Sequence, residues 1–209
     1  MTRSGARPAA GTPERDEVAA RRLFVATPLA ADAVEAVAAL VADLRRRVAD
    51  AATVRWVRMD GLHVTLRFIG PVDEPRIPAL AAAVDDVARH QGPFRVSISG
   101  GGAFPAPARP RLLWLGLTSG VAELSSLATR LGSRLEALGW PPDERPFRAH
   151  LTLARCDGVR AGPAVARELA LVAEPLTVEF EANRVVLFES LTGRGPARYL
   201  PVHEARLRS

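Results

Sequence analysis

HVTLRFIG, at residues 63–70, and HLTLAR, at residues 150–155, share the pattern His, aliphatic, Thr, Leu. In each segment apolar and polar residues alternate, which is typical of a half-buried β-strand. Alternation places His63 and Thr65 on one face of the first strand, and His150 and Thr152 on one face of the second. The chain has four histidines, and a His with Thr and Leu at these spacings is expected for roughly one histidine in two hundred. Two matches therefore indicate a repeat.

The composition is that of one globular domain that does not enter a membrane. The 209 residues are 48% hydrophobic, which is enough for a sizeable core. No apolar run is long enough to span a bilayer, and the N-terminal segment lacks the apolar region of a secretory signal. The single cysteine, Cys156, excludes an internal disulfide. We therefore expect a cytoplasmic protein.

The basic residues are all arginines, and the formal net charge is +5. The absence of lysine argues against nucleotidyl-lysine ligases, P-loop NTPases and Schiff-base enzymes, because each needs a lysine at the reacting centre. Arginine offers planar, bidentate hydrogen-bond donors to phosphate. The charge is therefore compatible with a phosphate-bearing partner.

Patterning along the chain predicts an α+β fold. Strands are expected at 22–26, 54–57, 63–69, 94–99, 112–117, 150–156, 176–181, 184–189 and 198–202, and helices at 28–48, 75–90, 121–138 and 163–172. Residues 1–20 are expected to form a disordered tail, and residues 21–209 a single domain. Each half of that domain holds one His-x-Thr strand. We predict a bilobal, pseudo-symmetric fold in which two antiparallel sheets face a central cleft and helices lie outside.

Two histidines facing one small volume suit paired acid and base catalysis. The imidazole pKa lies near neutrality, so one ring can be protonated while the other is neutral. The hydroxyls of Thr65 and Thr152 can donate hydrogen bonds to a bound oxyanion. A metal site would need further ligands, and Asp60 is the nearest candidate. The residues therefore favour phosphoryl transfer without a metal or another cofactor.

Other distinctive residues are expected to have structural roles. The three glycines at 100–102 lack the strand-to-helix context of a phosphate-binding loop. His90 ends a predicted helix and His203 lies near the C-terminus, so both are expected at the surface. Cys156 is expected to be a buried, inert thiol. The three tryptophans, Trp56, Trp114 and Trp140, are expected to pack in the core or between the lobes and not to serve as base platforms.

The paired motifs resemble those of the two-histidine (2H) phosphoesterase superfamily, and most closely its bacterial and archaeal RNA 2′,3′-cyclic phosphodiesterases, also called 2′-5′ RNA ligases. The resemblance extends in order over RLFVA (22–26), VRWV (54–57), LHVTLRFIG (62–70), GAFP (102–105), RPR (109–111), LWLG (113–116), RPFR (145–148), HLTLAR (150–155) and VVLFES (185–190). Ala149 departs from it, because the family usually has proline before the second histidine.

This resemblance implies a reaction and a set of roles. Water opens a terminal RNA 2′,3′-cyclic phosphate to leave a 2′-phosphate. The resemblance assigns His63 as the proton donor to the leaving 3′ oxygen and His150 as the proton acceptor from water, with Thr65 and Thr152 on the non-bridging oxygens. The spacing of the residues alone does not distinguish the two histidines. The reverse step would join a cyclic end to a 5′-hydroxyl through a 2′-5′ linkage without ATP.

Four further residues are candidate substrate contacts. Arg155 is expected to bind the phosphate and Phe68 to stack on the terminal base, as similar positions do in the family. Strict alternation puts both side chains on the face opposite the histidines, unless a strand end or a bulge re-aims them. A plain core role for Phe68 is the alternative. Arg67, which alternation places on the His63 face, and Arg148 are rival phosphate contacts.

The expected partner is RNA with a 2′,3′-cyclic phosphate end, such as a tRNA half, bound by a monomer. Two other functions stay open. One is a phosphodiesterase for a small cyclic phosphate, such as a cyclic nucleotide or an ADP-ribose cyclic phosphate. The other is a non-catalytic RNA-binding protein that retains the cleft.

Overall fold

A computed structural model describes residues 20–193 and 195–208 of the chain. The tail predicted at residues 1–20 lies outside this part, except for Ala20. The strands are β1 (Arg21–Pro28), β2 (Arg55–Trp56), β3 (His63–Val72), β4 (Phe94–Phe104), β5 (Leu112–Ser119), β6 (His150–Arg155), β7 (Val178–Ala182), β8 (Arg184–Leu191) and β9 (Arg198–Arg206). The α-helices are α1 (Ala31–Arg47), α2 (Ile77–Ala88), α3 (Val121–Ala137) and α4 (Gly162–Ala173). The predicted α+β class is confirmed.

The strands form one curled antiparallel sheet in the order β7-β4-β5-β6-β3-β1-β8-β9, and β2 pairs with β6. The two sheets predicted from the sequence are therefore joined edge to edge. The join is narrow, because Val64 on β3 and Leu151 on β6 are the only residues of these two strands, within the described ranges, that pair directly. The sheet consequently has two halves that meet at the two motif strands.

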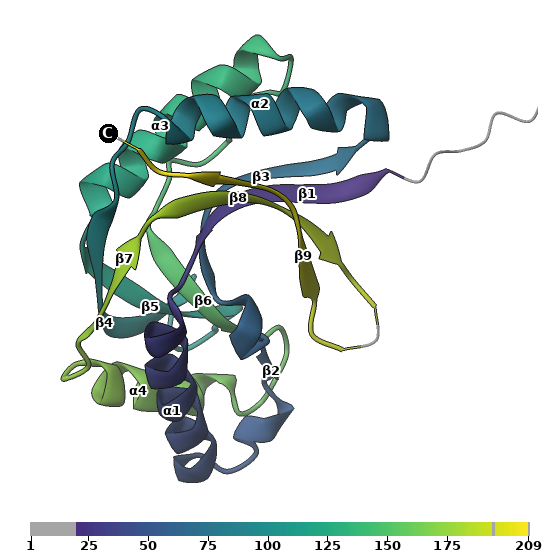
Figure 1. Cartoon of the computed structure of the whole chain (residues 1–209). Coiled ribbons are helices and arrows are strands. Elements are labelled where there is room, and N and C mark those ends of the chain that lie inside the picture. Colours follow the sequence, from purple (N-terminus) through teal and green to yellow (C-terminus); the bar gives the residue numbers. More distant parts are fainter. Residues whose placement is uncertain (1–19, 194, 209) are drawn as a thin grey trace, which may run out of the picture.

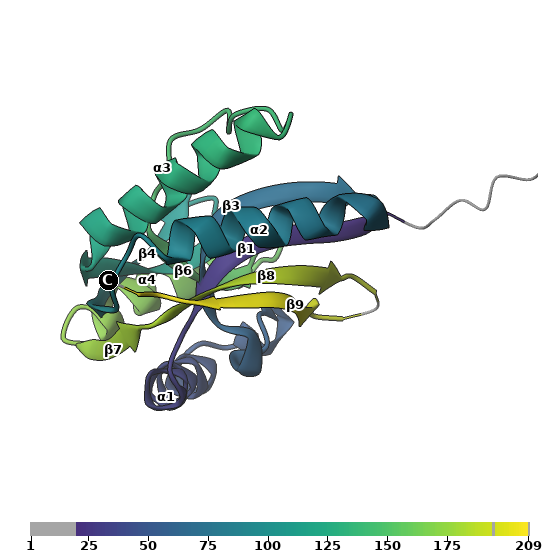
Figure 2. The same ribbon diagram turned by 45° about the horizontal axis from the view of Figure 1, so that its top comes forward.

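Each half of the sheet carries two helices on its convex side (Figures 1 and 2). Helices α2 and α3 cover β3, β1, β8 and β9, while α1 and α4 cover β4 and β7. The chain crosses between the halves, since α1 follows β1 in sequence but packs beside α4. The lobes are therefore interleaved in the sequence and do not correspond to its two halves.

The core lies between the sheet and the helices. Val64, Leu66, Leu151 and Leu153 of the two motifs are all at most 4% exposed and point into it. Fully burying a leucine or valine side chain contributes about 1.5–3 kcal/mol to folding. This burial fixes which way the motif strands face, and it leaves the histidines on the concave side.

Several local expectations can now be compared with the structure. The three glycines at 100–102 lie within β4 and form no loop, and a side chain at Gly101 would collide with Leu169 of α4. His203 lies partly exposed at the surface, as predicted, where it belongs to β9 and bonds to Asp85. His90 is exposed and Cys156 is buried, as predicted.

Candidate active site

The four motif side chains gather where β3 meets β6. Val64 and Leu151 are directly paired and buried, so the residues on either side of this pair project from the opposite, concave face. Because the strands are antiparallel, His63 lies on the same side of the pair as Thr152, and Thr65 on the same side as His150. All four side chains are partly exposed. The predicted convergence of the two motifs is therefore present in the fold.

Both imidazoles are held in the same way. The Nδ1 atom of His63 lies 2.7 Å from the carbonyl oxygen of Gly61, and Nδ1 of His150 lies 2.7 Å from the carbonyl oxygen of Arg148. A carbonyl oxygen can only accept, so each Nδ1 must carry the proton of this hydrogen bond. The Nε2 atom of each ring is therefore the one that can exchange a proton with a ligand.

His63 lies among aromatic rings. Its ring centroid is 4.9 Å from that of Phe24 and 5.0 Å from that of Tyr199, which meets it edge-on. Burial lowers the pKa of His63, because the charged imidazolium loses its hydration, and a positive charge on His150 lowers it further. The hydrogen bond to Gly61 acts in the opposite direction. The lowered pKa favours the neutral imidazole of His63.

A β-bulge in each motif strand redirects the residues that follow it. Along the β1–β3 pair, Ala26 faces Thr65 but Val25 faces Arg67, so Leu66 is the extra residue. Along the β5–β6 pair, Trp114 faces Thr152 but Leu113 faces Ala154, so Leu153 is the extra residue. The burial patterns show the same shift, because two consecutive residues are buried in each strand. The pseudo-symmetry thus extends to the bulges.

The bulges place Phe68 and Arg155 on the concave face with the histidines. Phe68 is 66% exposed, and its ring centroid is 5.9 Å from that of Phe24. A plain core role for Phe68 is therefore wrong. Arg155 is exposed, and within the described residues no carboxylate lies within 4 Å of its guanidinium. Burial raises the pKa of Tyr199, and the positive charge of Arg155 acts in the opposite direction. Arg155 is thus available to an anion in the cleft.

Arg67 does not face the cleft, and the expectation that it contacts phosphate is wrong. The bulge turns it to the convex side, where it is 7% exposed. Its guanidinium donates to the carbonyl oxygen of Pro141 and pairs with Asp143 at 2.7 Å. Arg67 thus holds the segment that leads from α3 to His150. Arg148 is exposed at the end of this segment, and its carbonyl group orients His150.

The concave face also holds aromatic residues that the sequence did not assign to the site, namely Phe24, Phe104, Phe188 and Tyr199. Phe24 and Tyr199 contact His63, while the ring of Phe104 meets that of His150 edge-on with centroids 5.6 Å apart. Trp114 stacks on Phe104 with centroids 5.2 Å apart. Trp114 is partly exposed on the concave side, whereas Trp56 and Trp140 are buried as predicted. Trp114 had a signal in the sequence, because it lies between the buried Leu113 and Leu115 of β5. Tyr199 had none, because exposed Arg198 and Leu200 flank it.

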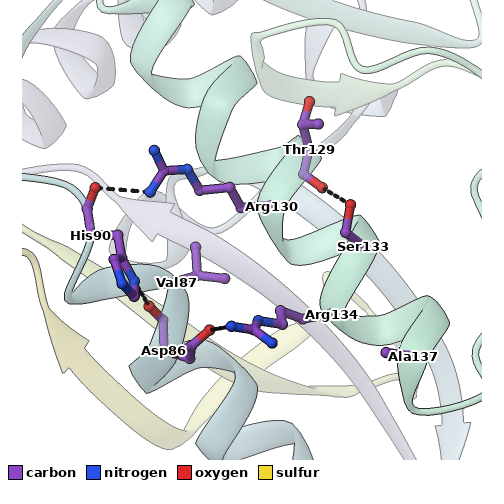
Figure 3. Close-up of a pocket in the computed structure, with 8 residues that line it drawn as sticks. All are labelled: Asp86, Val87, His90, Thr129, Arg130, Ser133, Arg134 and Ala137. Atoms are coloured by element: carbon purple, nitrogen blue, oxygen red, sulfur yellow. Dashed lines mark hydrogen bonds and ion pairs between the residues drawn. The ribbon is translucent and has the colours of Figure 1, made fainter.

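Figure 3 shows a separate hollow of about 400 Å³ between α2 and α3, on the convex side of the sheet. Arg134 pairs there with Asp86, and Arg130 donates to the carbonyl oxygen of His90. Neither motif contributes to this hollow.

No helix in the described ranges is long and apolar enough to cross a membrane. Residues 20–193 and 195–208 contain no group of three His, Cys, Asp or Glu side chains suited to a metal ion.

A curled antiparallel sheet with two His-x-Thr strands on its concave face defines the two-histidine phosphoesterase class. The sequence profile of the 2′-5′ RNA ligase superfamily matches residues 33–194, a range that contains both motifs. The chain therefore belongs to the 2′-5′ RNA ligase superfamily.

Individual relatives agree with this membership. The protein called RNA 2′,3′-cyclic phosphodiesterase in Aeropyrum pernix is 32% identical to the chain, and the match covers 75% of this chain and 88% of that protein. The protein of the same name in Archaeoglobus fulgidus is also 32% identical, and the match covers 84% of this chain and 94% of that protein. A solved structure from Thermus thermophilus is 26% identical and covers 90% of this chain and 98% of its own, with a TM-score of 0.74. The structure of E. coli LigT in complex with 3′-AMP is 26% identical and covers 91% of this chain and 99% of its own, with a TM-score of 0.68.

Proposed function

We propose that the chain hydrolyses RNA 2′,3′-cyclic phosphate ends to 2′-phosphates by metal-free acid–base catalysis with His63 and His150. The observation that carries this proposal is the matched pair of Nδ1–carbonyl bonds, which leaves one exchangeable Nε2 on each ring at the same concave face. The curated relatives named RNA 2′,3′-cyclic phosphodiesterase support the choice of reaction.

The proposed reaction needs one proton acceptor and one proton donor. Neutral His150 takes a proton from water through Nε2, and the oxygen of this water attacks phosphorus. The bond from phosphorus to the 3′ oxygen breaks, and His63 donates its Nε2 proton to that oxygen. The phosphate stays on the 2′ oxygen, and the proton balance of the two histidines is restored by exchange with solvent.

His63 must therefore be protonated when the substrate is bound, although burial lowers its pKa. The anionic phosphate provides the opposite charge that favours the imidazolium. A lowered intrinsic pKa also makes the imidazolium a stronger acid towards a developing alkoxide. Substrate binding and protonation of His63 are coupled in this proposal.

The remaining polar groups would bind the phosphate and the terminal base. Thr65, on the side of His150, and Thr152, on the side of His63, would donate to the non-bridging oxygens. Arg155 adds a charged donor, since no carboxylate within the described residues occupies it. Phe68 offers an exposed ring for stacking on the terminal base. Arg148 lies at the rim, where it would attract the RNA backbone.

Ligation needs the same groups in the same roles. A 5′-hydroxyl end that occupies the place of water would lose its proton to His150 and attack phosphorus, while His63 protonates the departing 3′ oxygen. The two RNA ends would then be joined through a 2′-5′ linkage without ATP. We therefore propose that ligation of RNA ends such as tRNA halves is a second activity of a monomeric, cytoplasmic enzyme.

The test uses an RNA oligomer with a 2′,3′-cyclic phosphate end in the presence of EDTA. The wild type should produce a 2′-phosphate, and His63→Ala and His150→Ala should each lower kcat by a factor on the order of 10² or more. His90→Ala is the matched control, because His90 is exposed on the far side of the sheet. An inactive wild type, or unchanged activity in both variants, would contradict the proposal.

The same assay separates the two alternative functions. A phosphodiesterase for small cyclic phosphates would turn over a free cyclic nucleotide or an ADP-ribose cyclic phosphate but not the RNA end. A non-catalytic RNA-binding protein would bind the oligomer with equal affinity after His63→Ala and would form no product.

A further inference from the structure

A second aromatic surface lies in the other half of the cleft, away from Phe68. It consists of Phe104 on β4 and Trp114 on β5, whose ring planes are inclined by 29° with centroids 5.2 Å apart. Both rings are partly exposed. We call this pair the Phe104–Trp114 platform.

The platform depends on a missing side chain at Gly102. Gly102 and Trp114 are direct partners between β4 and β5, and a Cβ atom at Gly102 would lie only 2.5 Å from the indole ring. Gly102 therefore allows the indole to lie close against the backbone of β4, where the tryptophan stays partly exposed. Any other residue there would displace the ring.

The platform adjoins the catalytic groups. Trp114 is the cross-strand partner of Thr152, so the two side chains project from the same face. Phe104 meets the ring of His150 edge-on, with centroids 5.6 Å apart. Gly116 is the partner of His150 and has no side chain to cover it. The surface is therefore continuous from His150 and Thr152 to the indole.

The half of the cleft that holds His63 has its own aromatic row. Phe24 pairs with Phe68 on one neighbouring strand and with Phe188 on the other, with ring centroids 5.9 Å and 5.4 Å apart. The paired histidines thus lie between two aromatic surfaces. A single nucleotide has only one base and can occupy only one of them.

We propose that the Phe104–Trp114 platform binds the base of the penultimate nucleotide while Phe68 stacks on the terminal base. This inference rests on the proposed function and specifies its substrate as RNA of at least two nucleotides. Aromatic rings stack on any base, so the platform selects for length and a splayed single strand more than for sequence. Arg148, which is exposed two residues before His150, suits the phosphate that links the two nucleotides.

The first experiment compares three substrates with the wild-type enzyme: adenosine 2′,3′-cyclic phosphate, the dinucleotide ApA ending in the same cyclic phosphate, and this dinucleotide with an abasic penultimate position. Base stacking of this kind predicts a kcat/KM that is roughly tenfold or more higher for ApA than for the mononucleotide. The abasic dinucleotide should lose most of this advantage, because it keeps the linking phosphate but has no second base.

The second experiment measures the ratio of kcat/KM for ApA to that for the mononucleotide in variants. Trp114→Leu should lower this ratio to about the value that the wild type shows for the abasic dinucleotide relative to the mononucleotide. Trp114→Phe, which keeps an aromatic ring, should retain most of the wild-type preference for ApA. The ratio is insensitive to a general loss of activity. The substrate comparison stands by itself if Trp114→Leu does not fold.

The outcomes separate this inference from the proposed function. Hydrolysis of all three substrates at equal kcat/KM would overturn the second base site while leaving the proposed function intact. An advantage that persists with the abasic dinucleotide would also overturn it, because charge alone would then explain the preference. No hydrolysis of any substrate would contradict the proposed function itself.

Discussion

Replacement of Arg67 by methionine distinguishes an anchoring role from phosphate binding. The Arg67 side chain is 7% exposed on the convex side of β3, and it holds the segment before His150 through Pro141 and Asp143. Methionine has a similar length and is apolar, so Arg67→Met removes both polar contacts with little change in packing.

The expected loss of stability is small because its terms oppose one another. A bond from a charged donor to the Pro141 carbonyl contributes about 1.5–3 kcal/mol, and the pair with half-exposed Asp143 adds no more than about 1 kcal/mol. The Nε atom of Arg67 is buried without a partner, and its removal relieves about 1–3 kcal/mol. The net destabilisation is therefore about 1 kcal/mol, or a decrease in Tm of about 2–4 °C.

Kinetics should show a fall in kcat, because the loosened segment carries the Arg148 carbonyl group that orients His150. Affinity for a nucleoside 2′-phosphate product should change by less than about threefold, since Arg67 does not reach the cleft. Unfolding in urea and product binding by calorimetry measure the two effects. Asp143→Asn is the matched control and should cost at most about 1 kcal/mol. A variant with wild-type stability and tenfold weaker product binding would refute this reasoning.

Three further predictions concern single groups. Arg155→Ala should weaken product binding by about 10- to 100-fold, the loss expected for one charged hydrogen bond, and calorimetry that shows no change would remove Arg155 from the site. Burial lowers the pKa of His63 in the folded state below its value of about 6.5 in the unfolded chain. The unfolded chain therefore takes up the proton first, and stability should decrease as pH falls from about 7 towards the folded pKa. Urea unfolding of His63→Gln should show a weaker pH dependence than the wild type, and an identical dependence would contradict the burial argument. Burial raises the pKa of the Cys156 thiol to about 11, so a thiol reagent at pH 7 should label native protein far more slowly than unfolded protein.

The elements and the paired motifs could be predicted because their signals are local. Alternation over four residues is enough to orient His63 relative to Thr65, and periodic apolar residues mark each helix. The bulges at Leu66 and Leu153 could not be predicted in the same way, since they arise from the registers with β1 and β5. For this reason alternation gave the wrong face for Arg67.

Long-range contacts account for the other differences. The pairing of Val64 with Leu151 joins the two halves into one sheet, and its partners are far apart in the chain. Tyr199 reaches His63 from β9, where Gly61 leaves space for its ring, since a Cβ at Gly61 would lie 2.9 Å from it. Neither contact leaves a periodic signal in the sequence, and only the assembled sheet brings these residues together.

The assignment of the donor and the acceptor is tested most directly with a substrate that has sulfur in place of the bridging 3′ oxygen. A thiolate leaves without protonation, so the general acid becomes dispensable while the base does not. With this substrate His63→Ala should approach wild-type activity, and His150→Ala should remain inactive. Rescue of His150→Ala in place of His63→Ala would reverse the two roles. Failure to rescue either variant would contradict proton donation to the 3′ oxygen by these histidines.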